Sequence, residues 1–188
     1  MSPSPRFRSI WCPGGIDHCD LFVVPTIAFQ HLFAFLVLSH ERRRLLWFAV
    51  TGNPTAEGLA RQITEAFPWD SAAKYLVRDK DRAFGAAFKA RVRAMGIRDR
   101  PTSFRSPWQN GYAERLIGSI RRECTDHLIV FNAEHLRRIL TKYAAYYNET
   151  RTDVSLGKDA PCTRAIERFG EVVAQPILGG LHHRYARI

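Results

Sequence analysis

The chain has 188 residues, of which 46% are apolar and 12% aromatic. This length and composition are those of a globular domain with its own core, and they exclude a disordered protein. Lysine and arginine outnumber the acidic residues by 28 to 18, which gives a formal net charge of +10. So positive a chain favours a polyanionic partner such as nucleic acid over an acidic small molecule.

The four cysteines have neither a CxxC pair nor the spacing of a zinc site. We therefore expect no zinc finger and no disulfide framework, which suits a reducing cytoplasm. The apolar stretch 21–38 is interrupted by proline and polar residues, among them Pro25 and His31. Its β-branched and aromatic content predicts two strands there, so we expect no membrane span and no signal peptide.

The first part of the chain reads as an irregular arm followed by strands. Residues 1–14 contain little periodicity, so no fold is expected of them. Strand-like segments follow at 19–28, 31–39 and 45–51. Because their connections are short, these three strands are expected to be antiparallel neighbours.

Helices and strands alternate in the next part. Asn53 and Pro54 are typical of a helix start, and apolar residues recur at helical spacing after them, at 59, 63, 66 and 67. A strand is predicted at 74–79, a helix at about 83–95 and an edge strand at 97–105.

Two further helices are predicted, each capped by an asparagine. Asn110 is expected to cap a helix that runs to about Asp126, and Asn132 a helix that runs to about Tyr147. The chain then becomes loop-rich, with a helical turn expected near 163–169 and a basic end. We expect an irregular arm over 1–14, a catalytic core over 15–150 and a basic, loop-rich extension over 151–188.

The order βββαβαβαα predicts an α/β domain of ribonuclease-H-like class, with a five-stranded mixed sheet flanked by helices. Three antiparallel strands come first and parallel strands are added to them. A flavodoxin-like or Rossmann sheet is the alternative, but it should begin βαβ with a glycine-rich first turn. Here Gly14 and Gly15 precede the first strand.

Three acids stand out by their positions: Asp20 within an apolar strand-like run, Asp79 at the end of another, and Glu114 near a helix start. An ionised carboxylate in such a strand is costly unless a cation or hydrogen bonds compensate it. Asp79 and Glu114 are 35 positions apart, which allows the chain to return to the same sheet end. Ordinary surface acids are the alternative interpretation.

Carboxylates that converge repel one another unless a divalent cation neutralises them. Oxygen ligands favour Mg²⁺, with Mn²⁺ as a substitute. Two such ions, about 3.5–4 Å apart, can activate the attacking oxygen and stabilise the leaving oxygen of a phosphodiester. We therefore expect a magnesium site with two ions that serves phosphoryl transfer.

A motif context supports this interpretation. The segment from Ser106 to Arg115, SPWQNGYAER, and its continuation LIGSIRRE resemble the third-acid signature of integrase-core (DDE) transposases of bacterial insertion sequences, relatives of retroviral integrases. Matching segments are DLFVVPT from Asp20, VRDKDR from Val77 and YYNETRT from Tyr146. The resemblance covers roughly residues 15–188.

The resemblance implies that Asp20, Asp79 and Glu114 are the catalytic residues and metal ligands of a DNA transposition or integration enzyme. Metal-dependent phosphodiester hydrolysis and strand transfer are the implied reactions. Two neighbouring acids are expected to have other roles: Asp17 as a loop acid and Asp81 as a helix-entry acid near the helix dipole.

DNA contacts are expected along and before the Glu114 helix. Helical spacing places Gly118, Arg121 and Arg122 one and two turns beyond Glu114, where the arginines could neutralise phosphates. A solvated helix face is the alternative. Gln109 and Asn110 are expected to touch a strand end or a base, and Arg115 is a further expected contact. Trp108 is expected to pack over its loop, and stacking on an unpaired base is the alternative.

The implied partners are element ends and target DNA, in a homo-oligomer that brings two DNA ends together. The implied location is the bacterial cytoplasm, on the nucleoid when DNA is bound. Relatives generally carry an N-terminal helix-turn-helix region, whereas about 14 residues precede this core. A separate helix-turn-helix protein is expected to supply it, or the chain is a catalytically silent DNA-binding remnant. A ribonuclease-H-like nuclease is a third hypothesis, which the 106–122 signature disfavours.

Overall fold

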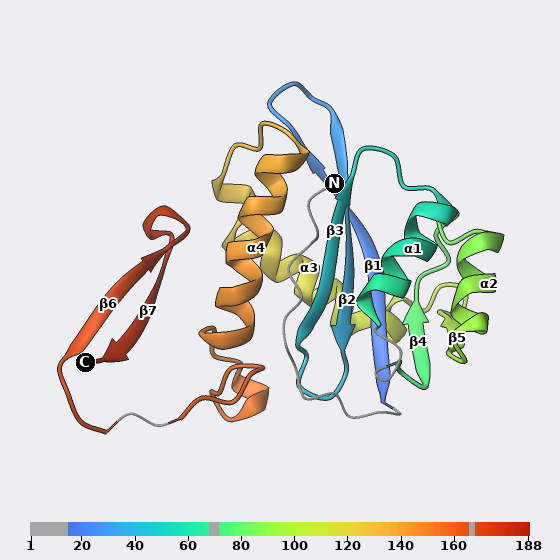
Figure 1. Ribbon diagram of the computed structural model, residues 1–188. Helices are drawn as coiled ribbons and strands as arrows, with labels where there is room; N and C mark the ends of the chain where they lie inside the picture. The colour runs from blue at the N-terminus through green and yellow to red at the C-terminus, as the bar shows by residue number, and fades with distance from the viewer. Residues whose placement is uncertain (1–14, 68–71, 166–167) are drawn as a thin grey trace.

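The computed structural model describes residues 15–67, 72–165 and 168–188 (Figure 1). Its main feature is a five-stranded sheet with the strand order β3-β2-β1-β4-β5. The strands are β1 (Ile16–Pro25), β2 (His31–Ser39), β3 (Leu45–Thr51), β4 (Tyr75–Arg78) and β5 (Arg98–Pro101). The first three strands pair antiparallel, and β4 and β5 are added parallel to β1. The ribonuclease-H-like fold predicted from the sequence is confirmed.

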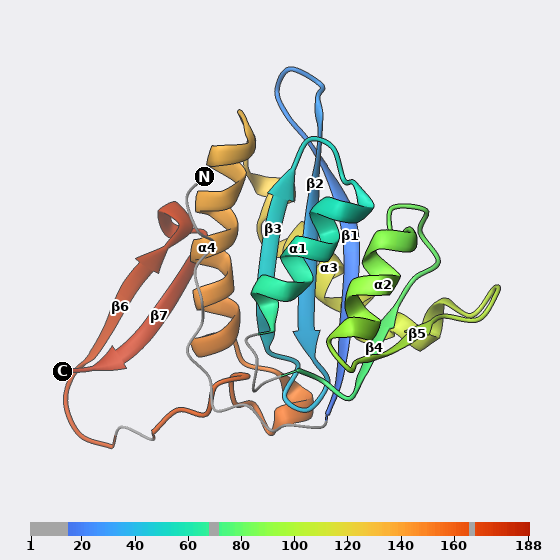
Figure 2. The same ribbon diagram turned by 45° about the vertical axis from the view of Figure 1, so that its right-hand side comes forward.

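Helices cover both faces of this sheet (Figure 2). They are α1 (Ala56–Ala66), α2 (Ala86–Ala94), α3 (Gly111–Glu123) and α4 (Ala133–Glu149). Because side chains alternate along a strand, β1 supplies both layers. Cys19 packs in the core with α1 and α2, whereas Phe22 and Val24 pack in the core with α3 and α4.

Helix starts differ in part from those predicted. Asn132 caps α4 as expected, and its Oδ1 accepts a hydrogen bond from the His135 N–H at 2.8 Å. The cap of α1 is Thr55, whose hydroxyl accepts from the Gly58 N–H at 3.0 Å, so the prediction of a start at Asn53 was wrong. The Asn53 N–H is instead held in a turn by the Thr51 hydroxyl, at 3.1 Å.

Two elements are shorter than predicted because side chains stabilise the adjoining loops. The Asp81 carboxylate accepts from the Ala83 N–H at 2.7 Å, and the resulting turn delays α2 to Ala86. The edge strand β5 ends at Pro101. Beyond it, Gln109 Oε1 accepts from the Ser103 N–H at 2.6 Å and draws the chain toward the short helix η1 (Pro107–Asn110).

The C-terminal part contains a β-hairpin where a loop-rich extension was predicted. Strands β6 (Val172–Ile177) and β7 (His182–Arg187) pair antiparallel around η4 (Leu178–Gly180). Both strands are largely exposed, so they lack the apolar alternation that marks a strand in sequence. The hairpin lies beside α4 (Figure 1), where the rings of His182 and Tyr146 stack at 4.2 Å.

The helical turn expected near 163–169 is absent from 163–165, and residues 166–167 lie outside the described part of the chain. The expected arm over 1–14 also lies outside it. Among the described residues, no helix combines the length and the apolarity that crossing a membrane requires.

Candidate active site

Asp20 lies on β1, and Asp79 directly follows the last residue of the neighbouring parallel strand β4. Cys19 of β1 pairs with Arg78 of β4, and each acid follows directly in its own chain. The side chains of Cys19 and Arg78 lie on the side of the sheet that α1 and α2 cover. By alternation, both carboxylates project toward the opposite side, which α3 covers.

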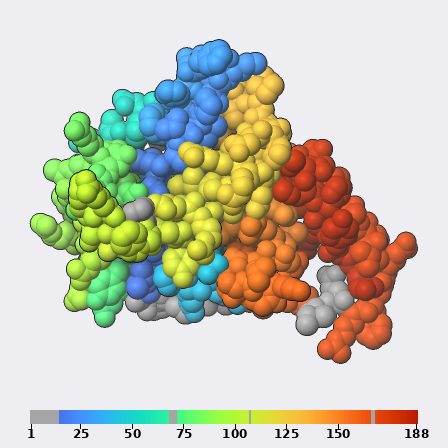
Figure 3. All heavy atoms as spheres, turned by 180° about the vertical axis from the view of Figure 1, so that it is seen from behind, coloured from blue at the N-terminus to red at the C-terminus, as the bar shows by residue number. Residues whose placement is uncertain are grey.

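Glu114 reaches this side from the first turn of α3, which packs against β1. Figure 3 shows this face of the molecule, with α3 in yellow exposed along its middle. The side chain of Glu114 is exposed, that of Asp79 is half-buried, and Asp20 is buried with 8% of its surface exposed. Three separate elements thus direct the three predicted acids toward one region.

Electrostatics also places the acids near one another. The pKa of Asp20 is raised to about 7, chiefly by burial. A hydrogen bond from the Leu21 N–H lowers this pKa in part, and the charges of Asp79, Glu114 and Asp81 raise it. The Leu21 nitrogen lies 2.8 Å from Asp20 Oδ1. Three other carboxylates are therefore within electrostatic reach of Asp20.

The donor chemistry of this region suits a hard divalent cation, because carboxylate oxygens are what Mg²⁺ and Mn²⁺ prefer. Burial raises the Asp20 pKa most, and the neighbouring negative charges that raise it further are the charge that a cation would neutralise. Within the described residues, no three His, Cys, Asp or Glu side chains are gathered closely enough to hold a metal ion.

Asn110 joins the start of α3 to β1. Its side chain is fully buried, with Oδ1 at 3.2 Å from His18 Nδ1, and Nδ2 donates to the Cys19 carbonyl and to Asp20 Oδ2, both at 3.4 Å. Asn110 is the N-cap residue of α3, as predicted, but its side chain makes no cap hydrogen bond. The buried contacts with β1 take the place of the cap.

The loop before α3 contains one further difference from expectation. Trp108 was expected to pack over the loop, yet 72% of its surface is exposed. Phe104, on the same loop, is 77% exposed, and the Arg105 guanidinium lies 5.2 Å from its ring centre. Gln109, predicted to contact DNA, is exposed and also holds this loop through Ser103.

The remaining residues predicted to contact DNA lie along α3. Arg115, Arg121 and Arg122 are exposed, and the Arg121 guanidinium lies 5.9 Å from the ring of Phe22. The Arg122 side chain folds back over Gly118. A Cβ atom at position 118 would lie only 3.0 Å from Arg122 Nη1. The glycine thus makes room for an arginine of its own helix.

Arg78 is a residue whose role the sequence did not reveal. Its side chain is only 2% exposed. Its Nε and Nη2 donate to the two oxygens of Asp99 at 2.8 and 2.7 Å, and its Nη1 donates to the Asp79 carbonyl at 2.9 Å. The Arg78 guanidinium also lies 5.2 Å from the ring of Phe84. It holds the backbone of Asp79 at the end of β4.

Asp17 is not a loop acid, because β1 begins at Ile16 and includes it. It pairs with Ser39 of β2 and is 5% exposed. Burial raises its pKa to about 7, although hydrogen bonds from His40 and Ser39 and the charge of Arg44 lower it in part. Three positions separate Asp17 from Asp20, so the two side chains project to opposite faces of the sheet.

Histidines near the site were given no role from the sequence. His18 Nε2 lies 2.9 Å from His40 Nδ1, and the two rings stack with centres 5.3 Å apart. Burial lowers the pKa of His18 to about 4, against the opposing effect of its hydrogen bond with Asn110. A neutral His18 therefore supports Asn110, and no spacing rule in the sequence indicates this pair.

Comparison with known proteins agrees with this fold. Residues 95–161, which include Glu114, match the family model described as integrase core domain. The HTLV-2 integrase catalytic core domain in complex with magnesium has the same fold, in a dimeric form (TM-score 0.63, 13% identity, covering 83% of this chain and 98% of that chain). Its trimeric form is similar (TM-score 0.61, 14% identity, 80% and 95% covered).

A chain of a simian T-cell lymphotropic virus intasome, solved in complex with PP2A regulatory subunit B56 gamma, also shares the fold. Its TM-score is 0.62 at 13% identity, with 98% of this chain and 71% of that chain covered. No curated protein matches the sequence. Residues 95–161 thus match an integrase core domain, and the chain has the fold of retroviral integrase catalytic cores, which confirms the predicted resemblance at that level.

Proposed function

We propose that this protein catalyses DNA transposition through Asp20, Asp79 and Glu114, as a transposase of the bacterial insertion-sequence type. The observation that carries the proposal is the pairing of Cys19 on β1 with Arg78 on β4, the residues directly before Asp20 and Asp79, with Glu114 on the helix over the same side. The match to an integrase core domain supports this class of chemistry.

The three carboxylates would hold Mg²⁺, or Mn²⁺ in its place, and two ions are expected. When bound, such ions activate the attacking oxygen and stabilise the leaving oxygen of a phosphodiester. The protein's own groups fix the ligands: the Leu21 N–H and Asn110 hold the Asp20 carboxylate, and Arg78 holds the Asp79 backbone. The HTLV-2 core domain, which shares the fold, was solved with magnesium.

DNA is the proposed substrate, both as element ends and as target. The net charge of +10 and the exposed arginines of α3 support binding to phosphates. Two ends must be held together for transposition, so a homo-oligomer is proposed. A separate helix-turn-helix protein is the proposed source of end recognition, and the bacterial cytoplasm and nucleoid are the proposed location.

The test is strand transfer with duplex oligonucleotides that match the DNA flanking the gene, a plasmid target, and Mg²⁺ or Mn²⁺. Joined products are expected for the wild type and not for Asp79→Asn or Glu114→Gln. The matched control is Glu57→Gln, which removes an exposed acid from α1 on the other side of the sheet. Joining that survives in the two site variants would contradict the proposed residues.

Two other outcomes would identify the competing hypotheses. Salt-dependent DNA affinity without any metal-dependent cleavage by the wild type would indicate a silent DNA-binding remnant. Cleavage of an RNA–DNA hybrid without DNA joining would indicate a ribonuclease-H-like nuclease, since fold alone does not choose between these activities.

A further inference from the structure

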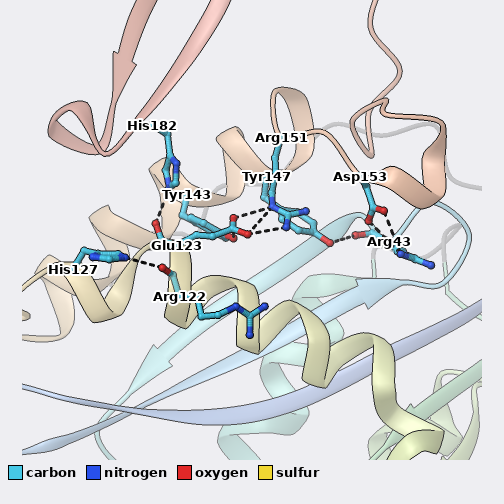
Figure 4. A network of polar contacts seen from close by, with 9 residues as sticks. All are labelled: Arg43, Arg122, Glu123, His127, Tyr143, Tyr147, Arg151, Asp153 and His182. Atoms are coloured by element: carbon cyan, nitrogen blue, oxygen red, sulfur yellow. Dashed lines mark hydrogen bonds and ion pairs between the residues drawn. The ribbon is translucent and has the colours of Figure 1, made fainter.

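A pocket of about 270 Å³ lies beside the proposed active site. It is bounded by α3, by the segment that follows α4, and by the turn between β2 and β3. Its charged and aromatic walls are four arginines and two tyrosines: Arg43, Arg115, Arg122, Arg151, Tyr112 and Tyr147. Asp153 also lines it, and Figure 4 shows Arg43 paired with Asp153 and Arg151 paired with Glu123.

Arg151 is held in place from behind. Its Nε and Nη2 donate to the two oxygens of Glu123 at 2.8 and 2.7 Å, and the Tyr143 hydroxyl donates to the same carboxylate at 3.0 Å (Figure 4). Burial acts to raise the pKa of Glu123, but the bonds and charge of Arg151 lower it below its ordinary value. The ion pair therefore persists at neutral pH and fixes the Arg151 side chain.

Arg43, which also lines the pocket, is fixed as well. Its Nη1 lies 3.2 Å from Asp153 Oδ2, its guanidinium lies 5.0 Å from the Tyr112 ring centre, and its carbonyl accepts from the Tyr147 hydroxyl at 3.0 Å. Its φ of +54° is in the left-handed region, which costs an ordinary side chain roughly 1 kcal/mol or more. The surrounding contacts hold this arginine in a conformation that directs it to the pocket.

Positive charge exceeds negative charge in this pocket. The carboxylates of Asp153 and Glu123 balance Arg43 and Arg151. Arg115 and Arg122 have no ion pair within the part of the chain that the structure describes. Two unbalanced guanidinium groups beside two preorganised ones suit an anion with several oxygen acceptors, and the planar guanidinium matches phosphate geometry.

The pocket lies alongside the carboxylates and not among them. Tyr112, Arg115, Ser119 and Arg122 follow one another at helical spacing on α3, and this stripe is next to the one that contains Glu114. Arg115 directly follows Glu114 in the chain. A polymer strand whose reacting phosphodiester lies at the carboxylates would place a neighbouring part of its backbone beside this stripe.

We propose that the pocket binds a backbone phosphate of DNA, and that Arg43 and Arg151 are DNA-binding residues together with Arg115 and Arg122. The proposal rests on the proposed function, in that it takes DNA as the substrate. The tyrosine walls leave apolar surface against which the adjoining sugar packs. Nothing in the sequence pattern assigns such a role to Arg43 or Arg151, which come from other elements.

The experiment measures binding of a labelled duplex oligonucleotide in EDTA across a series of salt concentrations, so that no catalysis is required. One variant is Arg122→Gln. The second is Glu123→Gln with Arg151→Gln, which removes the ion pair without leaving a lone buried charge. The matched control is Arg61→Gln, an exposed arginine of α1 on the opposite side of the sheet. Thermal unfolding verifies that each variant is folded.

Each pocket variant is expected to weaken DNA binding and to lower the slope of log affinity against log salt by about 1, as for a lost phosphate contact. The control keeps the wild-type slope to within a few tenths, as for an arginine that touches no phosphate. If the wild type binds DNA and folded pocket variants bind it equally well, the pocket proposal is overturned while the proposed function stands. Stabilisation of the wild type by inorganic phosphate, with unchanged DNA binding in the variants, would likewise overturn it. Wild type without DNA affinity would overturn both.

Discussion

The Asn110 amide nitrogen lies 3.4 Å from the Asp20 carboxylate, and this contact links the start of α3 to the middle of β1. Ninety positions separate the two residues in the chain. The same amide group bonds to His18 and to the Cys19 carbonyl, so one buried side chain ties Glu114's helix to the strand of Asp20. The relative placement of two proposed metal ligands depends on it.

Asn110→Ala is therefore expected to lower both stability and activity. The substitution leaves the buried His18 ring nitrogen and the Cys19 carbonyl without this partner, and a buried unsatisfied polar group costs about 1–3 kcal/mol. Urea unfolding of the variant and the wild type measures the loss. The control is Gln109→Ala, at an exposed neighbouring position, for which a smaller loss is expected. Equal stability of Asn110→Ala and the wild type would show that the link is dispensable.

Arg78→Ala is expected to be among the most damaging single changes. It leaves Asp99 without its bidentate partner and the Asp79 carbonyl without its donor, and breaking one side of a buried ion pair costs about 3–5 kcal/mol. The double variant Arg78→Met with Asp99→Asn is expected to recover part of this loss, since it leaves no lone charge. A double-mutant cycle by denaturant unfolding measures the coupling, and strictly additive losses would contradict it.

The buried Asp17 predicts a dependence of stability on pH. Its folded pKa of about 7 lies above the ordinary value of 3.8, so between these values the folded state binds more protons than the unfolded state. Its contribution is therefore fully present below about pH 4 and is lost as pH rises through about 7. Asp17→Asn is expected to gain on the order of 2–3 kcal/mol at pH 8 and little at pH 4. Unfolding at both pH values tests this, and an equal effect at both would contradict it.

The exposed Trp108 predicts a variant with normal stability and altered binding. With 72% of the side chain exposed, Trp108→Ala should change the free energy of unfolding by no more than about 0.5 kcal/mol. If the ring stacks on an unpaired base, affinity for single-stranded DNA should fall by about 1–3 kcal/mol. A stability loss of several kcal/mol would instead support the packing role expected from the sequence.

The sheet and its helices were predictable because their apolar residues follow the periods of strands and helices. β1 could be located from the run around Leu21, and α3 from its stripe at Ala113, Leu116 and Ile120. The hairpin β6–β7 was missed because its residues are mostly exposed and carry no such period. Apolar periodicity in the sequence reveals helices and strands that bury one face. It gives little sign of strands that are exposed on both faces.

Within the candidate site, the acids could be proposed from a motif, but the residues that support them could not. Asn110 reads locally as a helix cap, and Arg78 reads as one more residue of a basic cluster. Their actual partners, on β1 and β5, are distant in sequence. When a polar side chain is buried through contacts with residues distant in sequence, no local sequence pattern marks it. For the same reason Asp17 was predicted to lie in a loop.

The most direct test of the proposed catalytic triad is DNA joining by Asp20→Asn with Mn²⁺. The variant keeps the shape of the side chain and removes a negative charge, which burial and three nearby carboxylates disfavour. Without metal at pH 8, the variant should therefore unfold at a higher denaturant concentration than the wild type. Because Asp20 is a proposed metal ligand, this more stable protein is expected to join no DNA. Joining at the wild-type rate by Asp20→Asn would contradict the proposed role of the three acids.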